Sequence, residues 1–532
     1  MVAASQLPIN TNASAMQMAQ TIFGDGVSVV SASYTGDSRS SGIFTDGLDT
    51  SPGVAPSDTG VILSTGRAQD FTNSAGGWWW GPPNQANQDT NTSTNTSGPT
   101  NNSQFNAAAG TTTYDASWLD VDFIPTGNVM TMQFVFSSEE YPEYTTSQYQ
   151  DFVGVWVNGV QVELAAGDGD IDPLNINAGV NPNLFLSNTN SEYNTEMDGF
   201  TVTLTLTMYV NPGQVNSIRI GVADVVDSNY DSNLLIAGNS VQTTLVAMED
   251  MASVYPEGSV TIDVLANDLN HTGGVMTITH VNGIAVGAGD SVTLATGQVV
   301  TLNADGTLTF TGNGDVEEVS FTYGVESSTG ASDTGMVNVS SIPCFVAGTL
   351  IDTPDGARAV QTLRPGDLVS TRDHGAQPLR WIGRRVVSAR GAMAPIRIAA
   401  GTYGDHGAIM VSPMHRILLR DGLAELLFDA PEVLVAAKSL VNGTSVRPVE
   451  GGAVEYVHLL FDRHEILCAN GLDSESLLIG AMTNTLFPDE SLDEIVQLFP
   501  ELDLATGRGY SPSARRILRP YEARLLTTRV AA

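Results

Sequence analysis

The chain has 532 residues, a hydrophobic content of 42% and a formal net charge of −36 at pH 7. This length is too great for one hydrophobic core and predicts three or four domains, and the apolar content excludes global disorder. The excess of acidic residues, most of which lie in the first 343 residues, would repel nucleic acid and anionic membranes, and we expect no nucleic-acid partner.

The charge is divided unevenly along the chain. The first 343 residues contain three arginines, no lysine and 36 acidic residues, whereas the rest contain 18 arginines, one lysine and 22 acidic residues. The two formal charges of −33 and −3 predict that regions under different chemical demands join near Cys344. The acidic front region suits a solvated extracellular surface that binds calcium, although halophilic solubility gives the same signature.

Cysteine usage and apolar runs restrict the location of the protein. Both cysteines, Cys344 and Cys468, lie in the rear region, which excludes a disulfide-rich scaffold. The first 20 residues lack a basic stretch followed by an apolar core, and no run of about 18 apolar residues occurs. We therefore expect a secreted or cell-surface protein without a transmembrane segment, exported by a non-classical or type I-like route rather than through a Sec-type signal peptide.

The first 242 residues are predicted to form an N-terminal β-sandwich, because short strands alternate with turn-rich segments. The clearest strands are VMTMQFVF (129–136), FVGVWVNGVQVEL (152–164) with a hairpin signal at Asn158-Gly159, and FTVTLTLTMYV (200–210). A polar low-complexity loop (70–105) holds Trp78, Trp79 and Trp80. A tryptophan triplet can form a ligand platform, but we favour packing of this loop on its own domain.

Two long motifs in this region are unusual: FVFSSEEYPEYTTSQYQDFVGVWV (134–157) and IGVADVVDSNYDSNLLIAG (220–238). They resemble the choice-of-anchor L family of bacterial surface proteins. The resemblance implies a β-rich extracellular module with no established chemistry.

Acidic residues cluster in both motifs and between them. Clustered carboxylate oxygens are calcium ligands, although most acidic clusters are solvated turns and none here completes an EF-hand loop. The candidate calcium ligands are Glu139, Glu140, Asp168, Asp170, Asp172, Asp224, Asp227 and Asp231.

Residues 243–343 predict a second β-sandwich. The stretches VTIDVLANDLN (260–270) and VVTLNADGTLTF (299–310) alternate strands with Asn-Asp and Asp-Gly turn signals. This region resembles the cadherin-like or VCBS-type immunoglobulin-like repeats of bacterial adhesins, in a single copy, which implies a spacer.

Residues 344–480 again predict short strands, separated by turns at 353–356 and 364–367. Five of the seven histidines fall here, namely His374, His406, His415, His458 and His464. Metal binding is one interpretation, but no CxxC or HExxH pair is present, and His458 and His464 share a face only if they share a strand. A cysteine nucleophile with a histidine is another, because the thiol and imidazole work together near neutral pH.

Three blocks in this region occur in order: CFVAGTLIDTPDG (344–356), LRPGDLV (363–369) and SPMH (412–415). They resemble the Hint domains, the Hedgehog and intein self-processing fold, over residues 343 to 480. In that family the second block is Thr-x-x-His, and this chain has serine in place of threonine.

The resemblance implies a mechanism. Cys344 Sγ would attack the Pro343 carbonyl and turn the Pro343–Cys344 amide into a thioester, without a cofactor. His415 would protonate the leaving nitrogen, and Ser412 would hydrogen-bond the scissile carbonyl or orient His415. His464 is a further candidate for the same site. The chain lacks the asparagine junction that splicing needs, Asn470 being more simply a turn, so we expect attack by water or an external nucleophile; sterol transfer is disfavoured.

Other interpretations of these residues stay open. Cys344 can be a buried structural thiol, or can pair with Cys468 in a disulfide that locks the nucleophile. A lone histidine such as His415 is more often a core residue than a catalyst. The corresponding alternative function is a non-catalytic, calcium-binding adhesin or matrix protein with a degenerate Hint domain.

The last segment, residues 481–532, predicts a short helical tail that packs on the β core, with a C-terminal export signal as the competing interpretation. Apolar spacing in SLDEIVQLF and ARRILRPYEARLL predicts helices with a basic face made of Arg515, Arg516, Arg519 and Arg524. The whole chain is therefore predicted to be a mainly all-β, multidomain bacterial protein divided at 1–242, 243–343, 344–480 and 481–532. Its predicted function is single-turnover autoproteolysis, with its own polypeptide as substrate, which releases or attaches front modules that bind an unknown surface or extracellular ligand.

Overall fold

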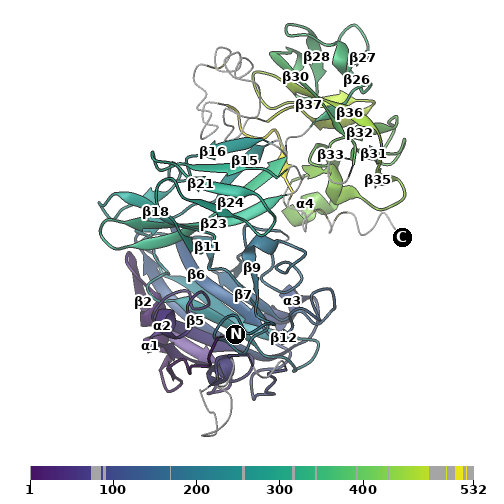
Figure 1. Cartoon of the computed structure of the whole chain (residues 1–532). Coiled ribbons are helices and arrows are strands. Elements are labelled where there is room, and N and C mark those ends of the chain that lie inside the picture. The colour runs from purple at the N-terminus through teal and green to yellow at the C-terminus, as the bar shows by residue number, and fades with distance from the viewer. Residues whose placement is uncertain are drawn as a thin grey trace.

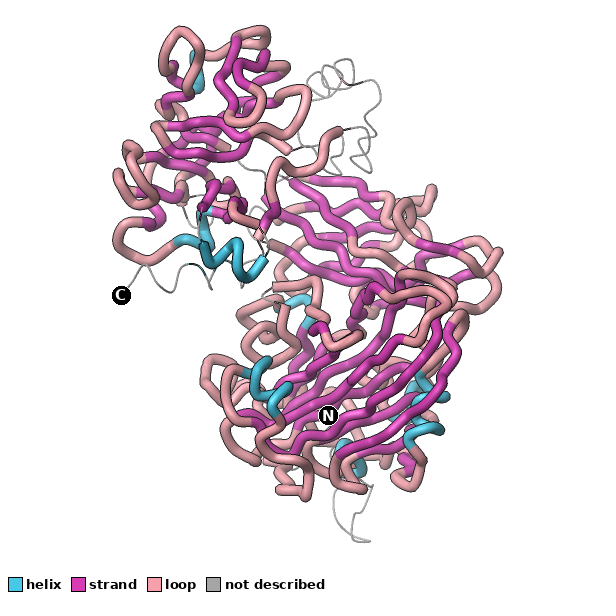
Figure 2. The backbone as a smooth tube through the Cα atoms, turned by 180° about the vertical axis from the view of Figure 1, so that it is seen from behind, coloured by secondary structure: helices cyan, strands magenta, loops and turns pink. Residues whose placement is uncertain are grey.

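The chain forms three β-rich modules in a row (Figure 1). We call them the N-terminal module (1–242), the middle module (243–341) and the cysteine module (from 344 onward). The computed structural model describes the chain except at residues 1, 74–85, 88–90, 168, 255–257, 314–317, 342–343, 391–393, 421, 429, 479–498, 500–509, 519–522, 524–525 and 527–532. Strands dominate all three modules and helices are few and short (Figure 2), which confirms the predicted all-β class.

The N-terminal module is a sandwich of two sheets. One sheet has the order β1-β3-β4-β13-β6-β10-β9, with β11 also paired to β6, and the other has the order β2-β5-β12-β7-β8. Every residue of β6 and β13 is buried, because these strands lie in the centre of the first sheet and the second sheet covers it. The elements are β1 (Ile9–Asn10), α1 (Ala15–Ile22), β2 (Val27–Thr35), β3 (Ser41–Phe44), α2 (Gly47–Thr50), β4 (Gly60–Ser64), η1 (Ala68–Phe71), α3 (Ser103–Ala109), β5 (Thr113–Pro125), β6 (Val129–Ser138), β7 (Phe152–Val157), β8 (Val160–Gln161), η2 (Pro182–Leu184), β9 (Phe185–Ser187), β10 (Gly199–Thr201), β11 (Leu204–Tyr209), β12 (Asn216–Val225) and β13 (Ser232–Ala237).

Local sequence signals explain several features of this module. Asn158 and Gly159 take positive φ angles of 51° and 82° between β7 and β8, as expected for a two-residue hairpin turn. The predicted strand at 200–210 divides into β10 and β11, which pair with different parts of β6. Helix α1 begins after Ser14, whose side chain and that of Gln17 form a capping box.

The middle module is a smaller sandwich that packs on the N-terminal module. Its larger sheet has the order β15-β24-β23-β18-β19 and the smaller has the order β16-β22-β21-β20. Met336 joins the core of the N-terminal module, and Asn338 Nδ2 donates to Ala165 O at 2.7 Å. The strands are β14 (Leu245–Val246), β15 (Asp250–Val254), β16 (Ser259–Ile262), β17 (Leu269–Asn270), β18 (Met276–Val281), β19 (Ile284–Ala285), β20 (Ser291–Thr293), β21 (Val299–Leu302), β22 (Leu308–Thr311), β23 (Val319–Ser327) and β24 (Ser332–Ser341).

The cysteine module contains two sheets around one core. The first has the order β30-β36-β25-β32-β31-β35 and holds Cys344 at its centre, and the second runs β27-β26-β37-β38-β33-β34-β39 with β28 and β29 attached. The elements are β25 (Phe345–Val346), β26 (Leu350–Ile351), β27 (Arg358–Ala359), η3 (Val360–Thr362), β28 (Leu368–Thr371), β29 (Gly375–Pro378), β30 (Trp381–Ser388), β31 (Ile396–Ile398), β32 (Ile409–Val411), β33 (Arg416–Arg420), α4 (Gly422–Phe428), β34 (Glu432–Ala436), η5 (Ala437–Leu440), β35 (Val446–Pro448), β36 (Ala453–Leu460), β37 (Ile466–Ala469), β38 (Leu472–Glu475) and β39 (Arg516–Ile517).

The tail agrees with its prediction in part where the structure describes it, because Ala523 and Leu526 are helical. Arg516–Ile517 is a strand, β39, parallel to β34, and not the start of a helix. Leu518, Ala523 and Leu526 are buried in the core of the module, as expected for a tail that packs on the β core. Arg515 forms ion pairs with Asp373 and Glu432 and does not belong to a free basic face. Arg519 and Arg524 lie outside the described residues.

Candidate active site

Cys344 lies directly before β25, between two neighbouring strands that each bring a polar side chain to it. Antiparallel pairing of Phe345 with Val457 on β36 sets Cys344 opposite His458, and pairing of Phe345 with Val411 on β32 sets it opposite Ser412. Residues 342 and 343 are outside the described part, so the carbonyl half of the predicted scissile bond is not described. The register alone therefore brings together three residues that are far apart in the sequence.

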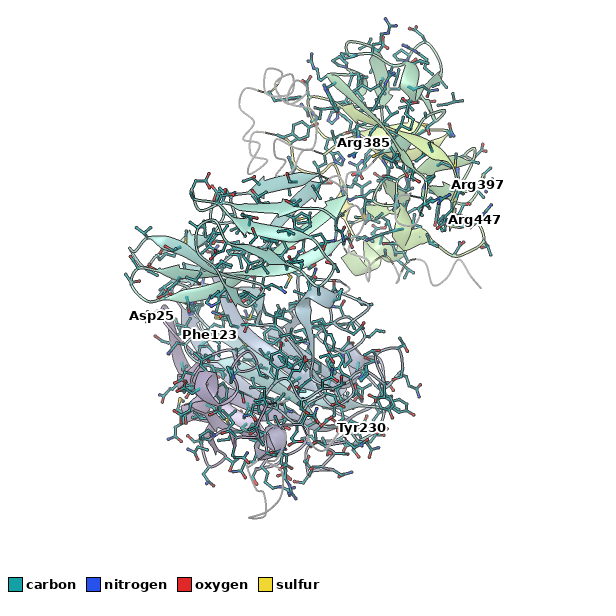
Figure 3. All side chains as sticks on the ribbon, viewed as in Figure 1. Asp25, Phe123, Tyr230, Arg385, Arg397 and Arg447 are labelled. Atoms are coloured by element: carbon teal, nitrogen blue, oxygen red, sulfur yellow. The ribbon has the colours of Figure 1, made fainter. Side chains whose placement is uncertain are left out.

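The Cys344 thiol is buried against His458. The distance from Cys344 Sγ to His458 Nε2 is 3.5 Å, and the two side chains are 4% and 1% exposed. Burial raises the pKa of the Cys344 thiol well above its usual range, against the lowering effects of Ser412 and of Arg385, which is labelled in Figure 3. The resting sulfur is therefore a thiol, and a base must take its proton before it can attack.

Ser412 holds the nitrogen side of the predicted scissile bond. Its Oγ accepts a hydrogen bond from the Cys344 amide N–H at 2.8 Å, and its own N–H donates to Cys344 O at 2.9 Å. The sequence predicted that the Ser412 hydroxyl contacts the scissile carbonyl or His415. The observed partner, the Cys344 amide N–H, is a different one. These two bonds fix the backbone of Cys344 on both sides of its Cα.

His415 follows Ser412 in a tight turn and packs on the ring of Phe345, with ring centroids 4.3 Å apart. It is 2% exposed, and neither ring nitrogen has a hydrogen-bond partner among the residues that the structure describes. Burial lowers the pKa of His415 to about 4, although Glu475 acts in the opposite direction. An unpartnered imidazole inside a protein is costly, so His415 is more than a satisfied core histidine.

His464 does not contact Cys344 in the structure. Its Nε2 lies 3.3 Å from Glu475 Oε2, its backbone N–H donates to Ser511 Oγ, and its Nδ1 accepts from the Ala514 N–H. Burial raises the pKa of Glu475, but Arg416 and His464 outweigh it and hold that pKa at about 2. His464 therefore ties the tail to the second sheet, and its support of Cys344 stays a prediction.

Cys344 and Cys468 do not form a disulfide in the structure, so the pairing that the sequence left open is not present. Cys468 lies in β37 of the second sheet, opposite Asp473, whereas Cys344 belongs to the first sheet and faces His458. The prediction was wrong because the two ends of the module enter different sheets.

His458 was not predicted as the partner of Cys344. The alternation of side chains along β36 is the one signal in the sequence that bears on it. His458 and Tyr456 lie two residues apart on β36, so their side chains share a face, and Tyr456 belongs to the same buried cluster as Cys344. The proposed sharing of a face by His458 and His464 fails because β36 ends at Leu460. In the described part of the chain, no three His, Cys, Asp or Glu side chains are arranged to hold a metal ion.

The candidate calcium ligands of the N-terminal module fall into different environments. Asp170 is exposed, Asp172 and Asp227 accept hydrogen bonds within their own turns, and Asp168 is outside the described residues. Glu139, Glu140, Asp224 and Asp231 are at most 3% exposed. Calcium binding stays a prediction, as does the packing of Trp78, Trp79 and Trp80, which also lie outside the described residues.

Asp151 joins this buried group, although it was not predicted. Its N–H donates to Glu140 Oε2 at 3.0 Å, and its carboxylate accepts from Ser232 Oγ at 2.8 Å. Burial raises the pKa of Glu140, Asp151 and Asp224, each of which also lies close to another acid. Burial and the neighbouring acids therefore favour the protonated, neutral form of these carboxyl groups.

Comparison with protein families assigns all three modules. Residues 7–242 match the Choice-of-anchor L domain, residues 242–340 a Bacterial Ig domain and residues 343–481 the Hint domain. No curated protein matches the chain. No helix in the described part is both long and apolar enough to cross a membrane.

Three solved structures similar to the C-terminal part share little sequence with it. They are the bacterial intein-like domain from Clostridium thermocellum (15% identity, 25% of this chain, 97% of that chain, TM-score 0.19), the gp41-1 intein (12%, 25%, 97%, 0.17) and the MchDnaB-1 intein (14%, 25%, 98%, 0.18).

The choice-of-anchor L match indicates a surface or extracellular protein. The chain thus carries a choice-of-anchor L domain, a bacterial Ig domain and a Hint domain, in this order.

Proposed function

We propose that the cysteine module breaks its own chain at the Pro343–Cys344 bond through an N-to-S acyl shift, once per molecule. The observation that carries this proposal is the position of Cys344, whose thiol meets His458 while its amide N–H is held by Ser412. A purely structural cysteine needs neither contact.

The first step forms one bond and breaks another. His458 takes the proton of the thiol, Cys344 Sγ attacks the Pro343 carbonyl carbon, and the C–N bond breaks, leaving a thioester and a free Cys344 amine. The 3.5 Å distance from Sγ to His458 Nε2 is within reach of proton transfer once the pair tightens.

The leaving nitrogen needs a proton, and His415 is the proposed donor. Within the described part of the chain its two ring nitrogens have no hydrogen-bond partner, and its turn begins at Ser412, which holds the Cys344 nitrogen. Because its pKa is lowered to about 4, protonated His415 is scarce at neutral pH but is a strong acid when it forms. General acid catalysis of this kind contributes on the order of 10²- to 10⁴-fold.

A thioester is less stable than the amide it replaces, so the shift needs a subsequent irreversible step. Water or an external thiol, amine or surface hydroxyl attacks the thioester, releasing the Cys344 thiol and transferring residues 1–343 to the attacker. Hydrolysis releases the front modules, and attack by a surface group attaches them. Residues 1–343 are then the delivered part, a secreted adhesion-like unit directed to an extracellular ligand.

The test is cleavage of the purified full-length chain with and without hydroxylamine. Wild type is expected to yield fragments of about 36 and 20 kDa, in proportion to the lengths of the two parts of the 56.0 kDa chain, and faster with hydroxylamine. Cys344→Ala is expected to stay whole, and Cys468→Ala, the matched control at the other thiol, is expected to behave as wild type. An intact wild-type chain under all conditions would leave the non-catalytic adhesin with a degenerate Hint domain as the better description.

A further inference from the structure

The middle module makes an apolar contact with the cysteine module. Trp381 and Leu460, which face each other on β30 and β36, and Leu477, after β38, belong to the same hydrophobic cluster as the core of the middle module. Each is at most 4% exposed. Figures 1 and 2 both show the end of the sheet that carries β15 and β24 against the cysteine module.

A second contact between the two modules is ionic. Lys438 Nζ lies 2.7 Å from Glu318 Oε2, and Lys438 is the only lysine of the chain. The backbone of the same turn supports the loop that carries the candidate catalytic groups, because Lys438 N donates to Pro413 O and Ala437 N donates to His415 O. The ion pair therefore connects the middle module to the Ser412–His415 loop.

Both contacts end on the elements that surround Cys344. Leu460 lies two residues after His458 on β36, so the two side chains project from the same face of the strand. The backbone N–H of Lys438 is hydrogen-bonded to Pro413 O in the Ser412–His415 loop. The middle module thus touches the supports of both the base and the acid of the proposed reaction.

The two sides of the scissile bond are also held by these two modules. Ser341, the last residue of β24, pairs with Val254 of β15, and Phe345 pairs with β32 and β36. Only residues 342 and 343 connect Ser341 to Cys344. A shift between the modules therefore moves Ser341, where the chain leaves the middle module, relative to Cys344.

We propose that the Ig domain is a positioning part of the self-processing unit, and that Trp381, Lys438 and Glu318 fix the end of β24 at Ser341 relative to the Cys344 thiol. The inference rests on the proposed cleavage reaction and replaces the expectation of a passive spacer. A misplacement of about 1 Å at a reacting atom costs about 100-fold in rate, so a contact remote from the chemistry can control it.

The charge contact gives the first test, made in the full-length chain with hydroxylamine-driven cleavage as the rate readout. Lys438→Glu and Glu318→Lys each place like charges together and are expected to slow cleavage about threefold or more, which is the scale of a partly exposed pair. The double variant restores the pair with reversed charges and is expected to recover the wild-type rate. Unaltered melting temperatures exclude a loss of folding as the cause.

The apolar contact gives the second test. Trp381→Ala is expected to slow cleavage at least tenfold and Trp381→Phe to retain most of the rate, with Val386→Ala as the control at an exposed residue of the same strand. Wild-type rates in Trp381→Ala and in both charge variants would overturn the positioning role and leave cleavage itself established. Failure of wild type to cleave overturns instead the proposed function on which the inference depends.

Discussion

Cys344 Sγ and His458 Nε2 lie 3.5 Å apart although 114 residues separate them in the chain. Their closeness follows from the pairing of β25 with β36. This pair is the reason to regard His458, rather than His464, as the base that acts on the thiol.

Replacing His458 should therefore slow thioester formation without removing the nucleophile. His458→Asn is expected to reduce the cleavage rate by about 10²-fold or more, because the thiol of raised pKa loses its proton acceptor. Gel densitometry after hydroxylamine addition measures the rate. His271→Asn, at an exposed histidine of the middle module, is the control, and an equal rate in both variants would contradict this role.

Ser412 should matter through its hydroxyl. Ser412→Ala removes the acceptor of the Cys344 N–H, leaves a buried donor unpaired, and is expected to slow cleavage about tenfold and to destabilise the module by about 1–3 kcal/mol. Ser412→Thr keeps the hydroxyl and should recover most of the rate. Thermal melting and cleavage kinetics on the same samples separate the two effects, and a Thr variant as slow as Ala would argue against the hydrogen bond.

The pH dependence of cleavage should identify the proton donor. Only protonated His415 can donate, and its pKa is lowered to about 4, so its protonated fraction rises as pH falls from 8 to 5. The contribution of His415 to the rate should rise over that interval and be lost in His415→Asn. Comparing the rates of the two proteins at each pH isolates this contribution, and a constant ratio across the range would rule out His415 as the acid.

The N-terminal module should lose stability as pH rises. Burial is the main cause that raises the pKa of Asp231 to about 7 and that of Glu139 to about 9. In the unfolded chain both carboxyl groups have ordinary pKa values near 4. The folded state thus binds more protons, so this stabilisation is full below about pH 4 and is lost as pH passes through 7 to 9. The melting temperature of the module should be lower at pH 9 than at pH 5.

Two variants and one ion sharpen that measurement. Asp224→Asn should weaken the pH dependence because it removes a buried acid, whereas Asp58→Asn, at an exposed acid, should not. If the ionised carboxylates bind calcium, millimolar calcium should restore the melting temperature at pH 9. If calcium leaves the melting temperature at pH 9 unchanged, the predicted calcium site is wrong.

The sequence predicted the site residues that lie in short, recognisable motifs. It missed the residues whose position depends on which strands pair and in which register. Cys344, Ser412 and His415 lie in short motifs that are informative by their sequence alone. Asn470 has a φ angle of 50° in the two-residue turn that the Asn-Gly pair predicts. The role of His458 required knowing which strand borders β25, and the buried position of Asp151 required knowing that Ser232 faces it. Both depend on pairing over long distances in the chain.

The tail shows a second limit. Its apolar spacing is compatible with a helix, yet Arg516 and Ile517 join the open edge of β34 as a parallel strand. The free hydrogen-bonding groups of a sheet edge can override a weak local preference, and only the completed sheet reveals that edge. The disulfide prediction failed for a related reason, since two cysteines in one compact module can still belong to different sheets.

The central claim is that Cys344 forms a thioester with the carbonyl of Pro343, and mass spectrometry of the hydroxylamine-treated chain tests it most directly. We predict a fragment that ends in a hydroxamate at Pro343 and a second that begins with an unmodified Cys344, in wild type and Cys468→Ala but not in Cys344→Ala. An uncleaved wild-type chain, or cleavage at Pro343 that persists in Cys344→Ala, would contradict it.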